Sequence, residues 1–525
     1  MAKNQLTLEE EDGIMVERKH SHHRGKRIMS NGFMRYEMKN GAEYASVYKA
    51  KRIGRKKTNE IEYLGRVIDK AQGIYQNRSR GIFSYSIERG YEKAEKRIET
   101  QSKEKLILDF GDVYVFDEIL KKTGLRAVYE SVLPEESDTL LAMVAHRTLD
   151  SSTASRYALE WWEGSYARML YPEAELRSQR ISEFLCAIGD ESRQRGFFRN
   201  YLSYLSAKGK SRSILVDSTG LPNDIQFPLT AINNHNGVVS NETRLILVVD
   251  RCTKMPIYFR YAAGNIVDVS TLKTTLLELS VFGIDVDFAI VDAGYYSEGN
   301  VREMQESGIS FIVRLVSNRK LYKELVDEHA DSLDDAANMV CYRQRLIFVK
   351  KVPIDLFGVA GYAYVAVDVD RKHDEIKRYA KAALENKDIS PHDMNQAMRT
   401  KGLFILLSSK DVSVNDILPL YYERQAIEHV FDFSKNNVDL LPLRVHTEDA
   451  FRGHLLLSFL ASAAYIAVNN LLDGSDDCAM SSFHLLRNLK CKVFDSCSIV
   501  LEPDKRMNAI AKHLKLVFPS SLDLW

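Results

Sequence analysis

Cysteine is scarce in this sequence. The 525 residues include six cysteines: Cys186, Cys252, Cys341, Cys478, Cys491 and Cys497. None forms a Cys-x-x-Cys pair or stands at the spacing from histidine that zinc sites use. The sequence therefore gives no sign of a zinc-finger or disulfide framework, and a reducing cytoplasm is the expected location.

Long hydrophobic runs are also missing. The most apolar stretch, Leu455–Val468, is shorter than the about 20 residues that a membrane-spanning helix needs. No signal-peptide pattern opens the chain, so we interpret Leu455–Val468 as a buried core helix and expect no membrane partner. The motifs GxxxxGK[ST] and GxSxG are absent as well, which leaves no basis for a P-loop nucleotide hydrolase or a serine hydrolase.

An overall excess of charge is absent, because 72 Lys and Arg balance 72 Asp and Glu. The charge is nevertheless unevenly distributed. Residues 18–57 contain thirteen basic side chains and two acidic ones, and such asymmetry indicates contact with nucleic acid or a membrane. The densest basic cluster is the candidate DNA-binding site: Lys51, Arg52, Arg55, Lys56 and Lys57.

The chain is long enough for three or four structural units, and its hydrophobic content of 45% is typical of globular proteins. Short β-branched and aromatic runs predict a small β-rich unit near the N-terminus. Apolar residues at i, i+3 and i+4 then predict a helical domain. Three strands, a helix, a strand, a helix and a strand follow, which is an α/β pattern.

A strand-rich insertion containing one charged helix separates this α/β part from helical segments at the C-terminal end. The predicted boundaries are 1–87 for the basic β-rich unit, 88–210 for the helical domain, 211–316 and 410–470 for the two parts of the α/β core, 317–409 for the insertion, and 471–525 for a C-terminal helical region.

Aspartates follow the apolar runs of three predicted strands. Asp217 follows Ile214–Val216, Asp292 follows Phe288–Val291, and Asp250 follows another such run. Ligands prefer the carboxyl ends of strands in α/β sheets. Ordinary turn chemistry also places aspartate at strand ends, and for any one of them this interpretation remains open.

A predicted C-terminal helix places Tyr421, Arg424, Glu428 and Lys435 within about 60° of one another around its axis. Charged side chains are seldom buried without partners, so this stripe is either a solvated face with an i,i+4 Arg–Glu pair or part of a polar site. Asp432 shares the face with Glu428 and competes with it as the acidic group of such a site.

Two aspartates on strands and one glutamate on a helix form a ligand set that suits Mg²⁺, which takes one or two carboxylates per ion and completes its shell with water and phosphate oxygens. Such a set fits two-metal phosphodiester chemistry. Arg424 and Lys435 would then position the phosphate, the arginine through its planar fork and the lysine as a point charge.

These segments resemble a known family. ILVDSTG, AIVDAGYYSEGN and the Tyr421-x2-Arg424-x3-Glu428-x6-Lys435 spacing are similar to the three acidic motifs of DDE transposases of bacterial insertion sequences, the group with a Tyr-Arg-Glu-Lys signature. The resemblance covers roughly residues 213–318 and 402–470. The GNIVD segment, which contains Asp268, and the basic N-terminal region resemble the family more weakly.

The resemblance implies a ribonuclease-H-like α/β core with a β-rich insertion, and a catalytic, metal-binding triad of Asp217, Asp292 and Glu428. It implies two Mg²⁺ ions, replaceable by Mn²⁺, and assigns Tyr421, Arg424 and Lys435 to phosphate positioning. The expected reaction is cleavage of DNA at the ends of an insertion sequence, followed by transfer of the 3′-OH to target DNA.

The expected partners are double-stranded DNA, as terminal inverted repeats and target, and a second copy of the chain in a synaptic dimer. The expected location is the bacterial cytoplasm at the nucleoid. A catalytically inactive DNA-binding descendant and a stand-alone nuclease of the same fold remain as alternatives.

The sequence departs from the family in its aromatic residues. Some members stack a flipped base on a tryptophan of the insertion, whereas the three tryptophans here are Trp161, Trp162 and Trp525. Five aromatic residues of the insertion could substitute for it: Tyr322, Tyr342, Phe348, Tyr362 and Tyr364.

Overall fold

The chain forms two compact units, residues 1–97 and residues 98–524. The computed structural model describes residues 32–39, 42–53, 56–77, 80–92, 106–150, 153–207, 211–223, 225, 228–235, 238–385, 390–436, 440–441, 443, 445–472, 479–494 and 497–522.

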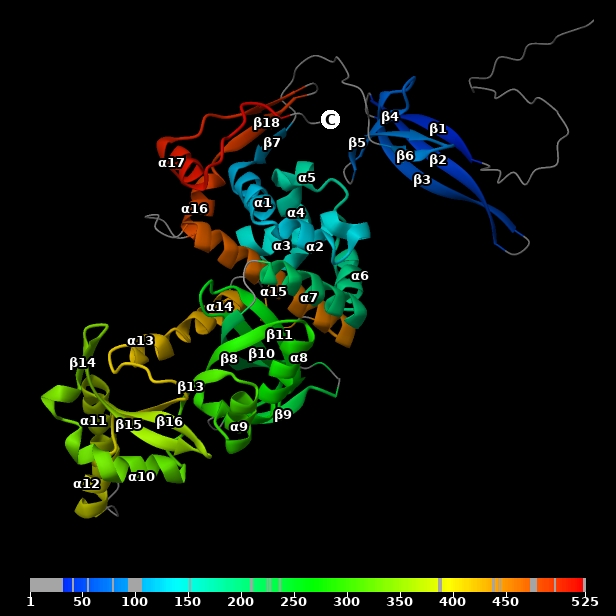
Figure 1. The fold of residues 1–525 in the computed structure, drawn as a ribbon. Helices are drawn as coiled ribbons and strands as arrows, with labels where there is room; N and C mark the ends of the chain where they lie inside the picture. Colours follow the sequence, from blue (N-terminus) through cyan, green and yellow to red (C-terminus); the bar gives the residue numbers. More distant parts are fainter. Residues whose placement is uncertain are drawn as a thin grey trace, which may run out of the picture. The chain divides into compact units, whose positions relative to one another are not determined.

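The first unit is an antiparallel sheet whose six strands pair in chain order (Figure 1). The strands are β1 (Gly32–Lys39), β2 (Ala42–Ile53), β3 (Lys56–Asp69), β4 (Ile74–Asn77), β5 (Gly81–Ser86) and β6 (Gly90–Glu92). Alternate side chains form a small core: Ala45, Val47, Leu64, Tyr75, Phe83 and Tyr85. The predicted strand character is therefore present, and it extends past the expected boundary at residue 87.

The hairpin of β2 and β3 is longer than its neighbours. Pairing with β1 ends at Lys49, and pairing with β4 begins at Arg66. Beyond Lys49, β2 and β3 continue to pair with each other as far as Ile53 and Lys56. Among the described strands this distal part has no other neighbour, so it is a two-stranded ribbon.

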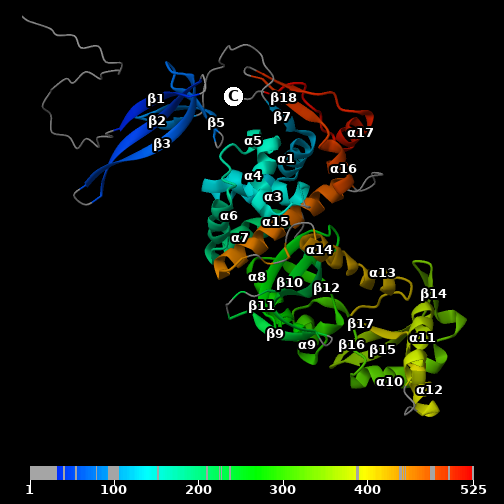
Figure 2. The ribbon, with the colours of Figure 1, turned by 180° about the vertical axis from the view of Figure 1, so that it is seen from behind.

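The second unit contains a helical part built around the long helix α15 (Glu448–Leu472), which packs against α3 and α6 (Figures 1 and 2). The other helices are α1 (Gly111–Thr123), α2 (Leu125–Glu130), α3 (Ser137–Leu149), α4 (Ala158–Gly164), α5 (Ala167–Leu170), α6 (Ser178–Ile188) and α7 (Glu191–Ser206). By length and composition α15 could cross a membrane, but 78% of its most apolar window is buried inside the protein. The prediction of a buried core helix for Leu455–Val468 is confirmed.

A three-stranded sheet joins the two ends of the second unit. It consists of β7 (Leu106–Asp109), β18 (Lys490–Val493) and β19 (Ser498–Val500), and it lies beside α16 (Ala479–Leu486) and α17 (Lys505–Leu514). Residues 88–210 and 471–525 were predicted to be a helical domain and a helical region, and the structure adds these short strands to their helices. The strands have three or four residues each, and β18 pairs with β7 from the other end of the unit. Such short strands with a distant partner leave no clear strand pattern in the local sequence.

The α/β part is organised around a ten-stranded mixed sheet with the order β11-β10-β8-β12-β13-β17-β16-β15-β14, with β9 paired to β10. Its strands are β8 (Ser211–Pro222), β9 (Ala231–His235), β10 (Val238–Asp250), β11 (Pro256–Ala263), β12 (Asp285–Val291), β13 (Ser310–Arg314), β14 (Met339–Tyr342), β15 (Arg345–Leu356), β16 (Val359–Asp368) and β17 (Leu403–Ser408). Strands β8, β12 and β13 run parallel, and the other neighbours are antiparallel.

The helices of this part are α8 (Leu272–Val281), α9 (Glu298–Glu306), α10 (Lys320–His329), α11 (Val369–Glu385), α12 (Pro391–Arg399), α13 (Ile417–Tyr422) and α14 (Gln425–Asn436). The predicted strands and helices are present as β8, β10, β11, α8, β12, α9 and β13, and the structure adds one strand that was not predicted, β9. The strands of the predicted insertion extend the core sheet, because β17 pairs with both β13 and β16.

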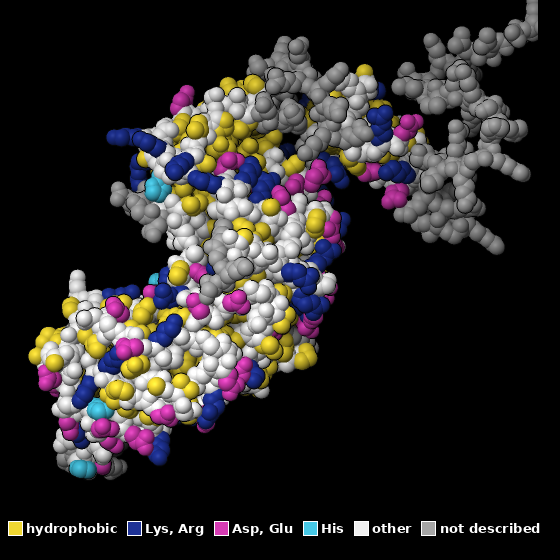
Figure 3. All heavy atoms as spheres, viewed as in Figure 1, with side chains coloured by type: hydrophobic (Ala, Val, Ile, Leu, Met, Phe, Trp, Pro, Cys, Tyr) yellow, Lys and Arg dark blue, Asp and Glu magenta, His cyan; other side chains and the backbone are white. Residues whose placement is uncertain are grey.

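Acidic and basic side chains are interspersed over the face seen in Figure 3, in keeping with the zero net charge.

Candidate active site

Asp217 and Asp292 lie together at one edge of a parallel strand pair. The ladder between β8 and β12 ends at Val216 and Val291, and each aspartate is the next residue. Asp217 itself lies in the middle of β8, not at its end as the sequence suggested, because β10 continues to pair with β8 as far as Pro222. The expected juxtaposition nevertheless results, since carboxyl ends of parallel strands share an edge.

Asp250, the third strand-end aspartate, is excluded from this edge. It pairs across the sheet with Ile214, near the start of β8, because β10 runs antiparallel to β8. Its buried carboxylate accepts hydrogen bonds from Arg212 (2.8 Å) and from the backbone and side chain of Thr253. Asp250 is therefore a turn-forming residue in an ion pair.

The segment with the four-residue signature is two helices rather than the predicted single one. α13 ends at Tyr422, and α14 begins at Gln425. Between them the backbone forms i,i+3 hydrogen bonds, from the Ala426 N–H to the Glu423 carbonyl (2.9 Å) and from the Ile427 N–H to the Arg424 carbonyl (3.0 Å). Arg424 thus lies in a tight turn directly before α14.

The guanidinium of Arg424 contacts all three carboxylates of the expected triad. Its nitrogens lie 2.9 Å from Asp217 Oδ2, 3.7 Å from Asp292 Oδ1 and 3.0 Å from Glu428 Oε1. The Tyr421 hydroxyl donates a longer hydrogen bond of 3.4 Å to Asp292 Oδ1. The structure therefore brings these five residues together from β8, the end of β12, α13, the turn that follows α13, and α14.

The remaining signature residue, Lys435, lies beside the site. Its ammonium group donates to Thr219 Oγ1 at 2.5 Å, which fixes the C-terminal part of α14 against β8. Asp432 is exposed on α14, and no described hydrogen bond or ion pair links it to Asp217 or Asp292. Thr219 was not singled out in the sequence, although it belongs to the ILVDSTG segment.

Burial dominates the electrostatics of the site. Removal of Asp217 from water raises its pKa to about 6, against the lowering effect of Arg424 and with a further increase from Asp292. Burial opposes the charged form of Arg424, but the neighbouring Asp292, Tyr421 and Asp217 more than offset this and raise its pKa. Burial lowers the pKa of Lys435. An additional cation at this edge would favour the ionised form of Asp217.

Among the described residues, no group of three acidic, histidine or cysteine side chains is close enough to hold a metal ion. At the triad, the guanidinium of Arg424 lies among the carboxylates. The donor set still fits a hard divalent ion, because it consists of carboxylate oxygens that converge on one positive group. An ion and Arg424 would compete for the same oxygens.

The insertion places one of its aromatic residues next to the signature. Tyr342 stacks on Tyr422 with ring centroids 5.3 Å apart, and the neighbouring Arg343 donates to Gln425 at the start of α14. Tyr322 and Tyr364 are buried, so they offer no exposed ring. Tyr342 is thus the candidate of the five that contacts the signature helices.

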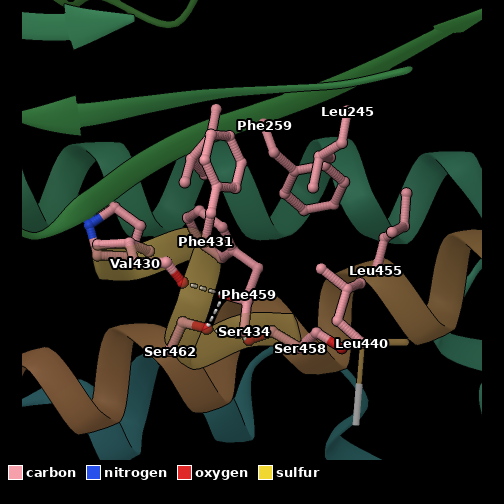
Figure 4. A pocket seen from close by; sticks show the side chains of 12 residues that line it. Leu245, Phe259, Val430, Phe431, Ser434, Leu440, Leu455, Ser458, Phe459 and Ser462 are labelled. Carbon is pink, nitrogen blue, oxygen red and sulfur yellow. Dashed lines mark hydrogen bonds between the residues drawn. The ribbon is translucent and has the colours of Figure 1, made fainter. Parts of the chain in front are cut away.

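A small cavity behind α14 is lined by apolar side chains and serines: Leu245, Leu247, Pro256, Phe259, Val430, Phe431, Ser434, Leu440, Leu455, Ser458, Phe459 and Ser462. Figure 4 shows the hydrogen bonds of Ser434 with Ser462 and with the Val430 carbonyl. The cavity contains no ionisable group and faces the buried side of α14, whereas Glu428 is on the exposed side. It is a packing gap on the buried side of the helix.

Comparison with known proteins identifies the class of the core. Residues 208–463, just under half of the chain, match the family model of the transposase DDE domain. The chain therefore contains a DDE transposase domain, a class that implies a polynucleotidyl transferase and generally uses divalent metal ions. No curated protein matches the chain.

A solved structure is also similar. It is a cryo-EM structure of a piggyBac transposase synaptic complex with hairpin DNA, with a TM-score of 0.39 and 11% sequence identity, and the match covers 74% of this chain and 82% of that chain.

Proposed function

We propose that this chain is a metal-dependent transposase that cleaves DNA at the ends of its own insertion sequence and transfers the freed 3′-OH to target DNA. The observation that carries the proposal is the contact of one guanidinium with Asp217, Asp292 and Glu428. Carboxylates from three separate elements converge there in a DDE domain with a ribonuclease-H-like arrangement of strands.

The residues of the site have two proposed roles, metal binding and phosphate positioning. Asp217, Asp292 and Glu428 supply the oxygen ligands, as carboxylates. They would hold divalent ions, which when bound would activate the attacking oxygen and stabilise the leaving oxygen of an in-line displacement. Once released from the carboxylates, Arg424 can bind a DNA phosphate through two parallel N–H groups, while Tyr421 orients Asp292 and Lys435 presents a point charge.

The N-terminal unit is proposed to bind the terminal repeats. The distal part of the β2–β3 ribbon contains Lys51, Arg52, Lys56 and Lys57, whose backbone pairing is described. Arg55 and the side chains of the other four lie outside the described residues. A two-stranded ribbon fits the major groove of B-DNA, and basic side chains supply phosphate contacts.

Two further parts of the proposal concern the assembly and its setting. Because two element ends must be cut and joined together, the active species is a dimer on paired ends. The Tyr421, Arg424, Glu428 and Lys435 spacing supports membership of the bacterial insertion-sequence group with that signature. We also propose that the protein acts in the bacterial cytoplasm at the nucleoid, because its proposed substrate is DNA.

One experiment separates this function from its alternatives. Full-length protein is incubated with labelled DNA carrying candidate terminal repeats and with a target plasmid, in Mg²⁺, Mn²⁺, Ca²⁺ or EDTA. A transposase cuts and joins in Mg²⁺ or Mn²⁺, and binds with little catalysis in Ca²⁺. Cleavage without joining identifies a nuclease, and binding without cleavage identifies an inactive descendant. Full activity in EDTA would reject metal dependence.

A further inference from the structure

Asp268 contacts the β8 strand one residue beyond Asp217. It opens a short 3₁₀ turn (Asp268–Ser270), and its Oδ1 atom accepts hydrogen bonds from Ser218 Oγ (2.5 Å) and from Arg244 (2.6 Å). Arg244, on β10, also donates to Ser218 Oγ at 3.1 Å. The three side chains therefore form a closed triangle beside β8.

The same carboxylate rests on the turn that follows Asp292. A Cβ atom added to Gly294 would lie 2.8 Å from Asp268 Oδ2, so the carboxylate packs directly on the backbone there. The 3₁₀ turn at Asp268 and the turn Ala293–Tyr295 are also neighbours in the fold. One side chain thus touches the segments that carry both aspartates.

Arg244 fixes this side chain. The arginine is largely buried, with 13% of its side chain exposed, and it also lies 3.8 Å from Glu242. Asp268 Oδ1 accepts hydrogen bonds from the Arg244 guanidinium and the Ser218 hydroxyl, and Oδ2 packs against the backbone of Gly294. The carboxylate therefore has little freedom to rotate. It can therefore act as a spacer of fixed length between β8 and the Asp292 turn.

We propose that Asp268, held by Arg244, is a positioning residue that sets the separation of Asp217 and Asp292 and so prepares their carboxylates for a divalent ion. The proposal rests on the proposed function in taking those aspartates as metal ligands. Asp268 itself acts through Ser218 and Gly294. Groups that orient metal ligands in this way typically change metal affinity about 10–100-fold when replaced.

A second Asp–Arg pair, between β10 and β8, provides a control. Asp250 and Arg212 are 2.8 Å apart and both are buried, but they lie away from the aspartate edge. If Asp268 contributes only fold stability, Asp268→Asn and Asp250→Asn should behave alike. If it positions the site, only Asp268→Asn should change ion binding.

The test uses the full-length protein and two measurements. Mn²⁺ binding is measured by titration calorimetry, and backbone hydrogen exchange of the metal-free protein is followed by mass spectrometry. Asp268→Asn should weaken Mn²⁺ binding about 10–100-fold and speed exchange in peptides spanning 217–220 and 292–295. Asp250→Asn should leave Mn²⁺ affinity unchanged and speed exchange near its own turn. Equal Mn²⁺ affinity in wild type and Asp268→Asn, or no Mn²⁺ binding by wild type, would overturn the proposal.

A glycine substitution gives an independent check. Gly294→Ala should push the Asp268 carboxylate away and weaken Mn²⁺ binding, but in the Asp268→Ala background the same change should add little, because the two act through one contact. Additive effects on Mn²⁺ affinity would reject the shared mechanism. A wild-type protein that binds Mn²⁺ as expected but neither cuts nor joins DNA would reject the proposed function and leave the positioning role intact.

Discussion

The guanidinium of Arg424 lies 2.9 Å from Asp217 Oδ2, in the position where a positive charge balances carboxylates from three different elements. Without a cation, these carboxylates would repel one another in a partly buried site. Arg424 therefore acts as a counter-ion in the metal-free protein. Once the Arg424 guanidinium leaves the carboxylates, its planar group of N–H donors is suited to bind a DNA phosphate.

Replacing Arg424 should make the stability of the folded protein depend more strongly on bound metal. Arg424→Gln leaves the carboxylates without their shared partner, so the free energy of unfolding of the metal-free protein should fall by about 2–3 kcal/mol, somewhat less than for a fully buried pair. Mn²⁺ should then raise the melting temperature more in the variant than in wild type, because the ion no longer competes with the guanidinium.

The control for this prediction is Arg487→Gln. Arg487 pairs with Asp112 and Asp150, at 3.1 Å each, in the helical part of the second unit and away from the triad, so this variant should show the wild-type response to Mn²⁺. An equal Mn²⁺-induced shift in Arg424→Gln and wild type would argue against competition between the arginine and the ion. Thermal denaturation with increasing Mn²⁺ measures both the stability of the metal-free proteins and the shift in melting temperature that Mn²⁺ causes.

The two strand-borne aspartates should be separable from the DNA-binding surface. Asp217→Asn or Asp292→Asn should each abolish cleavage, because each removes a metal ligand, while specific binding to terminal-repeat DNA stays within a few-fold. Asp250→Asn, the third strand-end aspartate, should still cut. Gel-shift and cleavage assays on the same labelled DNA test this. Near wild-type cutting by Asp217→Asn or Asp292→Asn would remove that residue from the triad.

Local sequence patterns were sufficient for the part of the sheet that carries the aspartates. Apolar runs rich in β-branched residues predicted β8, β10, β11, β12 and β13 but not β9, and the aspartates that follow two of these runs, Asp217 and Asp292, were expected to share one ligand set. The patterns could not distinguish an aspartate within a strand from one at its end, since this depends on how far β10 pairs with β8. Nor could they show that β17 continues the core sheet, which is decided by pairing with β13.

The contacts of Arg424 could not be predicted from the local sequence either. A continuous helix would place Tyr421, Arg424, Glu428 and Lys435 on one face; in the structure the first three lie together, whereas Lys435 contacts Thr219. The turn at Glu423 and Arg424 depends instead on tertiary interactions, because Glu423 pairs with Arg251 and Lys254 while Arg424 reaches Asp217. The position of the guanidinium among the carboxylates follows from that turn.

The sheet that joins the ends of the second unit can be tested through Cys491. This residue lies on β18 and is fully buried, and burial raises its thiol pKa to about 11. The thiolate is the reactive form, so at pH 8 Cys491 should be alkylated far more slowly than the exposed Cys252, with the rate increasing as the pH approaches 11. Peptide mass spectrometry after iodoacetamide treatment measures this. Equal labelling of both cysteines would contradict the sheet.

The β2–β3 ribbon should contribute to DNA affinity in a salt-dependent way. Neutralising Lys51, Arg52, Arg55, Lys56 and Lys57 together should weaken binding to terminal-repeat DNA. It should also reduce the slope of log affinity against log salt by about 0.9 for each phosphate that the protein no longer neutralises. Neutralising Lys505, Lys512 and Lys515 around α17 provides a charge-removal control and should change the slope less. An unchanged slope in the ribbon variant would mean that its charges are merely solvated.

The choice between the two acids of α14 is the most direct test of the site. Asp432 shares the predicted helix face with Glu428, but the turn before α14 brings Arg424 within 3.0 Å of Glu428 and links it to both aspartates. Glu428→Gln should therefore eliminate nicking and joining, whereas Asp432→Asn, on the same helix, should retain Mg²⁺-dependent cleavage. Both variants should melt near the wild-type temperature, since Glu428 and Asp432 are exposed. The reverse pattern of activities would require α14 to be rotated in the DNA-bound state and would transfer the third ligand to Asp432.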